Sequence, residues 1–354
     1  MADRVALYKP FLYVEINNKD VSAYITPYLL SFRYIDNDGL DKDESDDVEI
    51  EVEDSTGFFR KNPPARGSSL KVRFGYEEAV RDAGVFFIDS YTFRYSQSGA
   101  TFTIKALAKD VKASFRTLKT TAFENTSLKK IAQDIAKRNG YKLYFEGSDI
   151  TFQRIDQYKQ RDLEFLSQLC KRYGYTCKVA DGKIVIQGIE SILNRNATFV
   201  LTPEWVIDLE IEVSSLNAGT VDVVYLDPRK KEQTTDKKKT EVKASQDKQV
   251  QRVRVENKAQ AERISNAQKT LNEMKELKGR LTCVGIPSIY ASESIELKGF
   301  DKFDGVYYVS RVEHEIKRDG YTTRIEFLKK PGESKGGAKQ LLISFQKYII
   351  HSPA

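Results

Sequence analysis

The chain has 354 residues, more than one ordinary hydrophobic core usually holds, so two or three subdomains are expected. Hydrophobic residues make up 40% and charged residues 31%, and the 19 Tyr and 19 Phe favour β structure, which argues against a disordered chain. The 57 basic residues nearly balance the 51 acidic residues, so the net charge of +6 argues against a dedicated nucleic-acid-binding protein.

The N-terminal sequence has no apolar core of the secretory type, and no window approaches ~18 uninterrupted apolar residues. We therefore expect no membrane anchor and assembly in the cytoplasm. The three cysteines, Cys170, Cys177 and Cys283, give no even disulfide framework and no C-x-x-C spacing. This pattern suits a reducing compartment and argues against zinc.

Short alternating segments predict that residues 1–112 form a first β-barrel domain. Apolar and polar side chains alternate along a half-buried strand, and strands this short and closely spaced usually close into a small barrel or sandwich. The alternating segments are Leu12–Ile16, Val48–Val52, Leu70–Phe74, Val85–Tyr91 and Thr101–Ala106.

A helical period predicts that residues 113–198 form a helix-strand domain. The first helix has Thr126 or Ser127 as its N-cap and Gly140 as its stop. The second begins with Asp162 and ends at Gly174, and each helix is followed by Tyr and a strand. The apolar faces of the two helices are Leu128, Ile131, Ala132, Ile135 and Ala136, and Phe165, Leu166, Leu169, Cys170 and Tyr173.

The β pattern returns in residues 199–228 and 280–330, which we expect to form a second β-barrel domain. Residues 229–279 interrupt it as an inserted charged loop and helix. Arg229–Gln251 contain almost no apolar side chains and predict a mobile loop, because they cannot offset their own ordering entropy. A helix is predicted from about Asn257 to Lys278, with Gly279 as its stop. Residues 331–354 are predicted to be a linker and a C-terminal docking segment.

Histidine is nearly absent, so the catalytic and metal-binding arrangements that require histidine are not expected. Only His314 and His351 exist, which argues against Ser-His-Asp, Cys-His and two-histidine metal sites. His314 lies in the alternating run Val309–Ile316, which favours a strand position with a hydrogen-bonded ring. The glycines form no G-x-G-x-x-G or Walker pattern, and pairing among 51 acidic residues has no specificity. We predict no catalytic, cofactor-binding or metal-binding residues.

Two charged runs have a functional and a plainer interpretation. Asp36–Asp47 suggests calcium, but its glycine, its closing residue and its flanks do not fit an EF-hand loop. A solvated acidic turn between strands is the preferred interpretation, with docking by charge as the alternative. Lys237–Lys239 could contact phosphate, but it lacks interleaved aromatics, so a solvated loop is preferred.

One segment resembles a cell-wall-binding module. Thr126–Gly140 follows the rhythm of LysM peptidoglycan-binding modules. That rhythm is generic for a capped amphipathic helix, and the immediate second helix of a LysM unit is missing here.

The order of turn and core residues along about 330 positions carries a family resemblance. These residues are Asp46–Ile50, Asp54, Gly57, Pro64, Gly67, Phe86–Ser90 and Thr101–Ala108; then Ser127, Leu128, Ile131, Ala132, Gln157, Asp162, Phe165, Leu166, Tyr173 and Gly174; and finally Gly285–Pro287, Leu297, Gly299, Phe303–Gly305, Tyr308, Val309, Val312, His314 and Gly320–Thr323. In this order they resemble the late control protein D family, the baseplate hubs of contractile phage tails, which are related to the N-terminal region of VgrG spikes in type VI secretion.

The resemblance implies a mainly β fold with an α+β insertion: two related small antiparallel β-barrels flank a helix-strand domain, and a loop and helix interrupt the second barrel. Three copies of two barrels would form a ring of six similar walls, so that a threefold spike meets a sixfold tube. VgrG proteins continue into a β-helical spike, whereas this chain stops soon after Lys330. A separate spike partner is therefore expected, and residues 338–354 are a candidate docking peptide.

The predicted function is the structural central hub of a contractile phage tail or tail-like particle. It is a homotrimeric adaptor, located in the baseplate and assembled in the cytoplasm of the bacterial host. The expected partners are a trimeric spike, the tail tube or a tube-initiator protein, other baseplate proteins and the tape measure, with no specific nucleic acid. The alternative is a tail-associated peptidoglycan-binding or peptidoglycan-degrading protein, which would clear peptidoglycan in a zymogram. A DNA-contacting tail protein would instead bind duplex DNA with a steep salt dependence.

Overall fold

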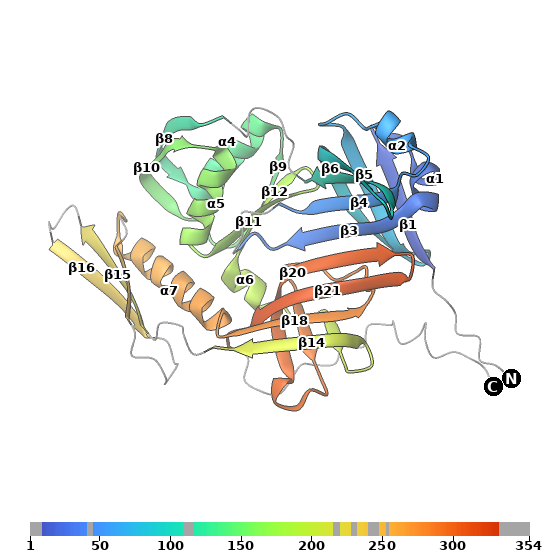
Figure 1. The fold of residues 1–354 in the computed structure, drawn as a ribbon. Coiled ribbons are helices and arrows are strands. Elements are labelled where there is room, and N and C mark those ends of the chain that lie inside the picture. The colour runs from blue at the N-terminus through green and yellow to red at the C-terminus, as the bar shows by residue number, and fades with distance from the viewer. Residues whose placement is uncertain are drawn as a thin grey trace.

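The computed structural model describes residues 9–40, 45–108, 117–214, 220–227, 232–239, 248–252 and 255–332. The fold is mainly antiparallel β with a few helices, as the sequence predicts (Figure 1). The described elements form three regions: an N-terminal β region, a helix-strand region and a C-terminal β region. Among the described residues, every helix is too short or too polar to span a lipid bilayer.

The N-terminal β region is built from alternating strands that bury one face. Its elements are β1 (Pro10–Ile16), β2 (Lys19–Asp20), α1 (Ser22–Ile25), η1 (Thr26–Tyr28), β3 (Leu29–Asn37), β4 (Asp47–Glu53), α2 (Phe58–Lys61), β5 (Ser69–Tyr76), β6 (Ala79–Ser96) and β7 (Gly99–Leu107). Along β4, Val48, Ile50 and Val52 are buried while the acidic residues between them face outward. The core includes five buried phenylalanines, which are Phe32, Phe59, Phe74, Phe86 and Phe102.

The helix-strand region follows the predicted order of two helices, each leading into a strand. Its elements are β8 (Lys119–Ser127), α4 (Leu128–Asn139), β9 (Lys142–Glu146), β10 (Thr151–Gln160), α5 (Asp162–Arg172), β11 (Tyr175–Ala180), β12 (Lys183–Gly188) and α6 (Ile189–Leu193). The Ser127 side chain caps α4 by accepting from the backbone N–H of Lys130, and Gly140 ends the helix at φ 77°. The predicted turn at Asp181–Gly182 joins β11 to β12.

The C-terminal β region has the predicted strands around a second core. Its elements are β13 (Phe199–Leu201), β14 (Val206–Val213), β18 (Leu277–Val284), β19 (Ser294–Leu297), η2 (Asp301–Phe303), β20 (Gly305–Lys317) and β21 (Gly320–Lys329). The interruption between β14 and β18 contains β15 (Thr220–Asp227), β16 (Glu232–Lys239), β17 (Lys248–Arg252) and α7 (Lys258–Met274).

Three sequence predictions fail in this interruption. Glu232–Lys239 and Lys248–Arg252 of the predicted loop are strands, because pairing with β15 satisfies their backbone groups without an apolar core of their own. The sequence assigns Val221–Leu226 to the second β-barrel domain, but this segment lies in β15. It pairs with β16 and β17 in a separate sheet and not with the C-terminal β region. Gly279 lies within β18 and ends no helix: α7 stops at Met274, and the Phe327 ring occupies the space that a Cβ would need. Residues 338–354 lie outside the described residues.

The two β regions join in one continuous sheet. β3 pairs with β20, with Phe32 opposite Ile316 and Asp36 opposite Val312. Figure 1 shows β14, β18, β21, β20, β3 and β4 one above another. We call the run β14-β18-β21-β20-β3-β4-β7-β6 the wall sheet; its strands alternate in direction throughout.

The two halves of the wall sheet share one strand plan. Along the sheet, β6-β7-β4-β3 is followed by β20-β21-β18-β14, so β3 corresponds to β14, β4 to β18, β6 to β20 and β7 to β21, in the same chain order. Register shifts fall at equivalent places, before Ser90 in β6 and before Arg311 in β20. The same holds before Ser31 in β3 and before Asp208 in β14. The two halves therefore interrupt their regular strand pairing at equivalent places.

Candidate functional site: a buried ionic junction behind a charged wall

Asp36, at the inner face of β3, connects all three regions of the molecule. Phe32, Tyr34 and Asp36 alternate along the strand toward the core, so the carboxylate enters the protein interior. Its Oδ2 lies 2.8 Å from Arg81 Nη2 of β6, and its Oδ1 lies 2.5 Å from Lys178 Nζ of β11. The backbone N–H of Ala291, from the C-terminal β region, donates to Oδ2 at 3.2 Å.

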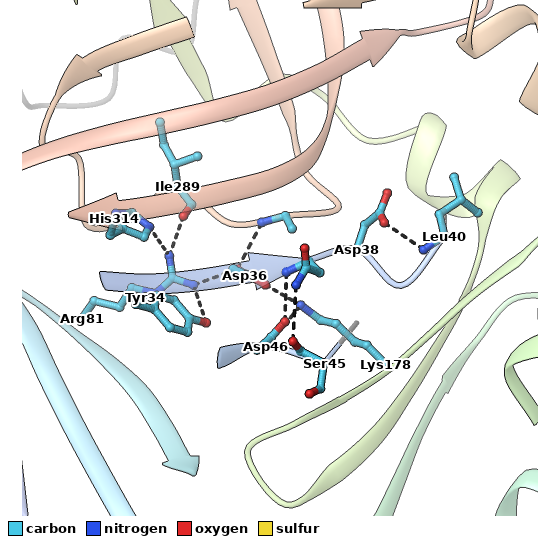
Figure 2. Close-up of polar contacts among 12 residues, drawn as sticks. Tyr34, Asp36, Asp38, Leu40, Ser45, Asp46, Arg81, Lys178, Ile289 and His314 are labelled. Atoms are coloured by element: carbon cyan, nitrogen blue, oxygen red, sulfur yellow. Dashed lines mark hydrogen bonds and ion pairs between the residues drawn. The ribbon is translucent and has the colours of Figure 1, made fainter. Parts of the chain in front are cut away.

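Arg81 extends the junction into the C-terminal β region. Figure 2 shows its guanidinium between Asp36 and His314. One nitrogen, Nη1, donates to the Ile289 carbonyl at 2.5 Å and lies 3.0 Å from His314 Nε2. Because a guanidinium only donates, Nε2 accepts, and the ring proton resides on Nδ1. The predicted strand position of His314 with a hydrogen-bonded ring is confirmed.

Burial controls the charge state of His314. Desolvation, followed by the nearby Arg81 cation, holds the pKa of His314 well below its usual value, so the ring is neutral. Its Nδ1 lies 2.7 Å from the hydroxyl of Tyr321 and 3.2 Å from that of Thr323. The ring is fully buried. It therefore serves as a fixed hydrogen-bonding group within the core.

Lys178 and Asp46 complete the junction on the side of the helix-strand region. Lys178 Nζ lies 3.5 Å from Asp46 Oδ2, and Asp46 Oδ1 accepts from the backbone N–H of Asn37 at 2.9 Å. Burial raises the pKa of Asp46 to about 7, outweighing the nearby Lys178. For Asp36, burial alone would raise the pKa, but Lys178 and Arg81 outweigh it and hold the pKa below its usual value.

Asp38 fixes the chain just beyond β3. Tyr308 donates its hydroxyl to Asp38 Oδ2 at 2.9 Å, and the N–H of Leu40 donates to Oδ1 at 2.8 Å. A Cβ on Gly39 would lie 2.4 Å from the Cys177 carbonyl oxygen, so this segment runs directly against β11. The acidic run therefore ties the helix-strand region to both β regions.

The predicted solvated acidic turn is wrong for the described part of the run. Asp36, Asp38 and Asp46 have side chains in the interior because cations and backbone donors from distant segments meet them there. The missed signal is the phase of β3: Asp36 continues the inward alternation of Phe32 and Tyr34. Nothing in their own segments marks Arg81 and Lys178 as its partners.

The opposite face of the wall sheet is charged. Cross-strand ion pairs cover it, including Arg33–Glu49 at 3.2 Å and Arg324–Glu313 at 3.6 Å. A hollow of about 380 Å³ lies on this side between β14 and β3, and its lining includes Glu210, Lys278, Arg280, Arg311 and Glu326. Charged side chains thus dominate this face of the sheet, and the hollow also reaches Phe327 and Leu328.

A metal centre would require a group of His, Cys, Asp or Glu side chains facing one another, and the sequence predicts none. In the part of the chain that the structure describes, no group of three such residues is arranged to hold a metal ion. Cys170, Cys177 and Cys283 are free thiols in the core. The arrangement at the junction is one of mutual neutralisation, with carboxylates facing cations.

Three comparisons with known proteins place the fold. A model of the family described as Alg8 N-terminal domain matches residues 62–318. A curated relative, a probable baseplate hub protein of Escherichia phage 186, is 28% identical over 181 residues, which are 50% of this chain and 44% of the relative. The alignment thus spans less than half the length of that relative.

Two solved structures share the fold. The tail protein from Neisseria meningitidis MC58 has a TM-score of 0.71 at 11% identity, covering 91% of this chain and 97% of that one. An E. coli protein described as a component of the type VI secretion system has a TM-score of 0.55 at 11% identity, covering 92% of this chain and 77% of that one.

Proposed function

Because the chain belongs to the family described as Alg8 N-terminal domain, and its curated relative is a probable baseplate hub protein, we propose that it is the structural central hub of a contractile phage tail or tail-like particle. The kinship with baseplate hub proteins that the sequence predicts is confirmed. In this proposal the protein works by binding, without catalysis, as a homotrimer that joins the tail tube to a trimeric spike.

The observation that carries the proposal is the joining of two equivalent half-walls through β3 and β20. Each half is one unit of a repeating wall, a small barrel in which four strands face one side. One chain then supplies two neighbouring units. Three chains supply six, which is the number needed to match a sixfold tube while keeping threefold symmetry for the spike.

The charged face supports the assignment of this wall to the lining of an axial channel. A channel through which other tail components pass must not retain them, so its wall should be wet and free of large apolar patches. The outward residues of β4 are Asp47, Glu49, Glu51 and Glu53, and those of β20 include Glu313 and Glu315. Intramolecular ion pairs such as Lys105–Glu49 at 3.4 Å neutralise part of this charge.

The buried junction supports a role in transmitting force. Arg81, Asp36 and Lys178 connect the N-terminal β region with the other two regions. Removing one member of a buried ion pair leaves an uncompensated charge, so relative movement of the regions is strongly opposed. A hub that transmits force during contraction requires this rigidity. The spike, the tube, other baseplate proteins and the tape measure are its proposed partners, in the baseplate of the particle, after assembly in the host cytoplasm.

The mass and shape of the purified protein test the proposal. Light scattering should give three times the chain mass of 40.5 kDa, and negative-stain images should show a ring with a central hole. A zymogram on peptidoglycan should show no clearing, and duplex DNA should not be retained. A protein that stays monomeric at every concentration and forms no ring would contradict the hub, and clearing of peptidoglycan would favour the cell-wall alternative.

A further inference from the structure

Two of the three cysteines lie on facing elements of the helix-strand region. Cys170 is in the last turn of α5, on the inward face of the helix that also carries Leu166. Cys177 is on β11, where it alternates inward with Tyr175 and Val179. All five side chains belong to one hydrophobic core cluster, so one sulfur enters this interior from the helix and the other from the strand.

A tight turn holds α5 and β11 in this arrangement. The backbone N–H of Tyr173 donates to the carbonyl of Cys170 at 3.1 Å and closes the end of the helix. Gly174 follows with φ 76°, and a Cβ there would lie 2.8 Å from the Cβ of Ala267. β11 therefore turns back along α5, and only residues 171–176 separate the two cysteines.

The two thiols are in contact. A side-chain hydrogen bond joins Cys170 and Cys177, which are both free thiols. Cys170 has no exposed surface, whereas Cys177 is 9% exposed. Burial, together with that hydrogen bond, raises the pKa of Cys170 well above its ordinary value, so this thiol is protonated at neutral pH. The fold thus sets two sulfurs side by side, which is the arrangement that a disulfide requires.

The surroundings argue against two other uses of these thiols. Within the part of the chain that the structure describes, no group of three potential ligands could hold a metal ion. A catalytic thiol needs a nearby cation that lowers its pKa. The adjacent Lys178 extends instead to the other face of β11, where its Nζ lies 2.5 Å from Asp36 Oδ1. The placement therefore favours a bond between the two sulfurs.

We propose that Cys170 and Cys177 form a disulfide between α5 and β11 when the protein passes from a reducing to an oxidising environment. In the proposed hub this passage is the release of the particle from the host cell, but the pairing itself does not depend on assembly.

The oxidant is a small disulfide. One cysteine sulfur attacks it as a thiolate and forms a mixed disulfide, and the second cysteine sulfur then displaces the remaining half of the oxidant. One S–S bond forms in the protein and the S–S bond of the oxidant breaks. The oxidant is thereby reduced to two thiols, which take up the two protons that the cysteines lose.

Exposure sets the order of the two attacks. Cys177 is the member of the pair with surface open to solvent, so it reacts with the oxidant first. Cys170 is already in contact with it and closes the bond. Because the thiolate is the attacking species, the raised pKa of Cys170 makes this second step slow at neutral pH. The bond should therefore form over hours.

The disulfide would fasten the strand that carries the junction lysine. Lys178 follows Cys177 in β11, and its Nζ lies 2.5 Å from Asp36 Oδ1 and 3.5 Å from Asp46 Oδ2. Oxidation thus ties α5 to the strand that anchors the helix-strand region to the N-terminal β region.

Peptide mapping without reduction tests the bond. Trypsin cleaves between the two cysteines, so they fall in separate peptides, Asp162–Lys171 and Tyr173–Lys178. After the native full-length protein has been incubated with cystamine, these peptides should appear as one species about 2 Da lighter than their sum. Alkylation under denaturing conditions should then label Cys283 and neither member of the pair.

Cys283 is the internal control. Its Sγ donates to the Thr323 carbonyl at 3.4 Å in the core of the C-terminal β region. C283S should leave the linked peptides unchanged, whereas C170S should abolish the link. In S98C, a thiol at the exposed turn between β6 and β7 should take up cystamine, which shows that the oxidant is active.

A glutathione redox buffer measures how strongly the fold favours the bond. At equilibrium, the ratio of linked to reduced pair should be at least about tenfold higher in the folded protein than in concentrated urea. The reason is that contact between the thiols raises their effective concentration.

The outcomes bear on the thiol pair alone. Alkylation of all three cysteines, under conditions in which S98C reacts, would overturn the proposal. So would a link to Cys283, or a ratio in the folded protein that is no higher than in urea. None of these results affects the proposed hub, which is tested by the mass and the ring of the assembled protein.

Discussion

The N-terminal and C-terminal β regions have the same strand plan but fill it with different side chains. At one equivalent cross-strand pair, the N-terminal region sets Val48 opposite Ala106, whereas the C-terminal region sets Gly279 opposite Phe327. A Cβ on Gly279 would lie 2.0 Å from the Phe327 ring. The large ring on one strand thus requires the missing side chain on the other. The same strand plan thus accommodates different distributions of side-chain volume between paired positions.

The two regions also contribute differently to the buried junction. The N-terminal region supplies the ions Asp36, Asp46 and Arg81, whereas the C-terminal region supplies neutral groups, among them the Ile289 carbonyl and His314. The only other cation at Asp36 and Asp46 that the structure describes is Lys178, from the helix-strand region. The N-terminal β region therefore supplies charged side chains, and the C-terminal β region contacts them through hydrogen bonds from neutral groups.

The largest expected effect comes from removing the cation that crosses this asymmetric boundary. Arg81→Met should lower the free energy of unfolding by about 3–5 kcal/mol, because Asp36 loses a buried partner and the C-terminal acceptors lose their donor. Urea unfolding at one fixed protein concentration measures the change, since assembly would alter apparent stability.

Arg324→Met is the matched control for that substitution. Arg324 is on the charged face, where its side chain is 48% exposed and lies 3.6 Å from Glu313. Its loss should cost less than about 1 kcal/mol. Equal losses for the two variants would show that the junction contributes no more than a surface ion pair.

The next effect is a pH dependence at Asp46. Burial raises its pKa from 3.8 to about 7, so between these values the folded protein binds more protons than the unfolded chain. Stability contributed by this group is present below pH 4 and is lost as pH rises through about 7. Asp46→Asn, which mimics the protonated acid, should therefore gain stability relative to wild type as pH rises from 4 to 7, by at most about 4 kcal/mol.

The quantity to measure across pH is the difference in the free energy of unfolding between wild type and Asp46→Asn. His314 has a lowered pKa and destabilises both proteins alike at low pH, so its contribution cancels in the difference. Urea midpoints at several pH values between 4 and 8 supply the curve. A wild-type stability that rises relative to Asp46→Asn over this range would contradict the assignment.

A smaller effect tests the exchange of volume between the regions. Gly279→Ala should destabilise by about 1–3 kcal/mol, because its Cβ overlaps the Phe327 ring. Phe327→Leu on its own creates a cavity, but in the presence of Gly279→Ala the two changes should compensate in part. A double-mutant cycle measures that coupling, and strictly additive losses would show that the glycine is not matched to the ring.

The sequence predicts the repeated elements well because each follows from local chemistry. Ser127 and Gly140 delimit α4, and Asp181–Gly182 forms a turn, since caps and turns depend on a few adjacent residues. The alternation in β4 identifies its buried face. Polar strands such as β16 escape prediction because their pairing partner, not their own composition, makes them strands.

The junction is beyond local sequence reasoning for a different reason. Asp36, Arg81 and Lys178 are far apart in the chain and meet only after the β regions and the helix-strand region have packed. A run of acidic residues normally indicates a solvated surface, because isolated buried carboxylates are costly. Only its position in the alternation of β3, on the same inward face as Phe32 and Tyr34, indicates that Asp36 is buried. That position does not identify Arg81 and Lys178 as its partners.

The smallest expected effect concerns the charged face that both halves of the wall share. Glu49 lies 3.2 Å from Arg33 and 3.4 Å from Lys105, with side chains partly open to water. Glu49→Gln should change the free energy of unfolding by less than about 1 kcal/mol, and 0.5 M salt should reduce the difference further, because water and ions screen exposed pairs. Arg81→Met should keep its full effect in the same salt. A loss at Glu49 that is large and unaffected by salt would mean that the face is covered in the assembled protein and does not line a wet channel.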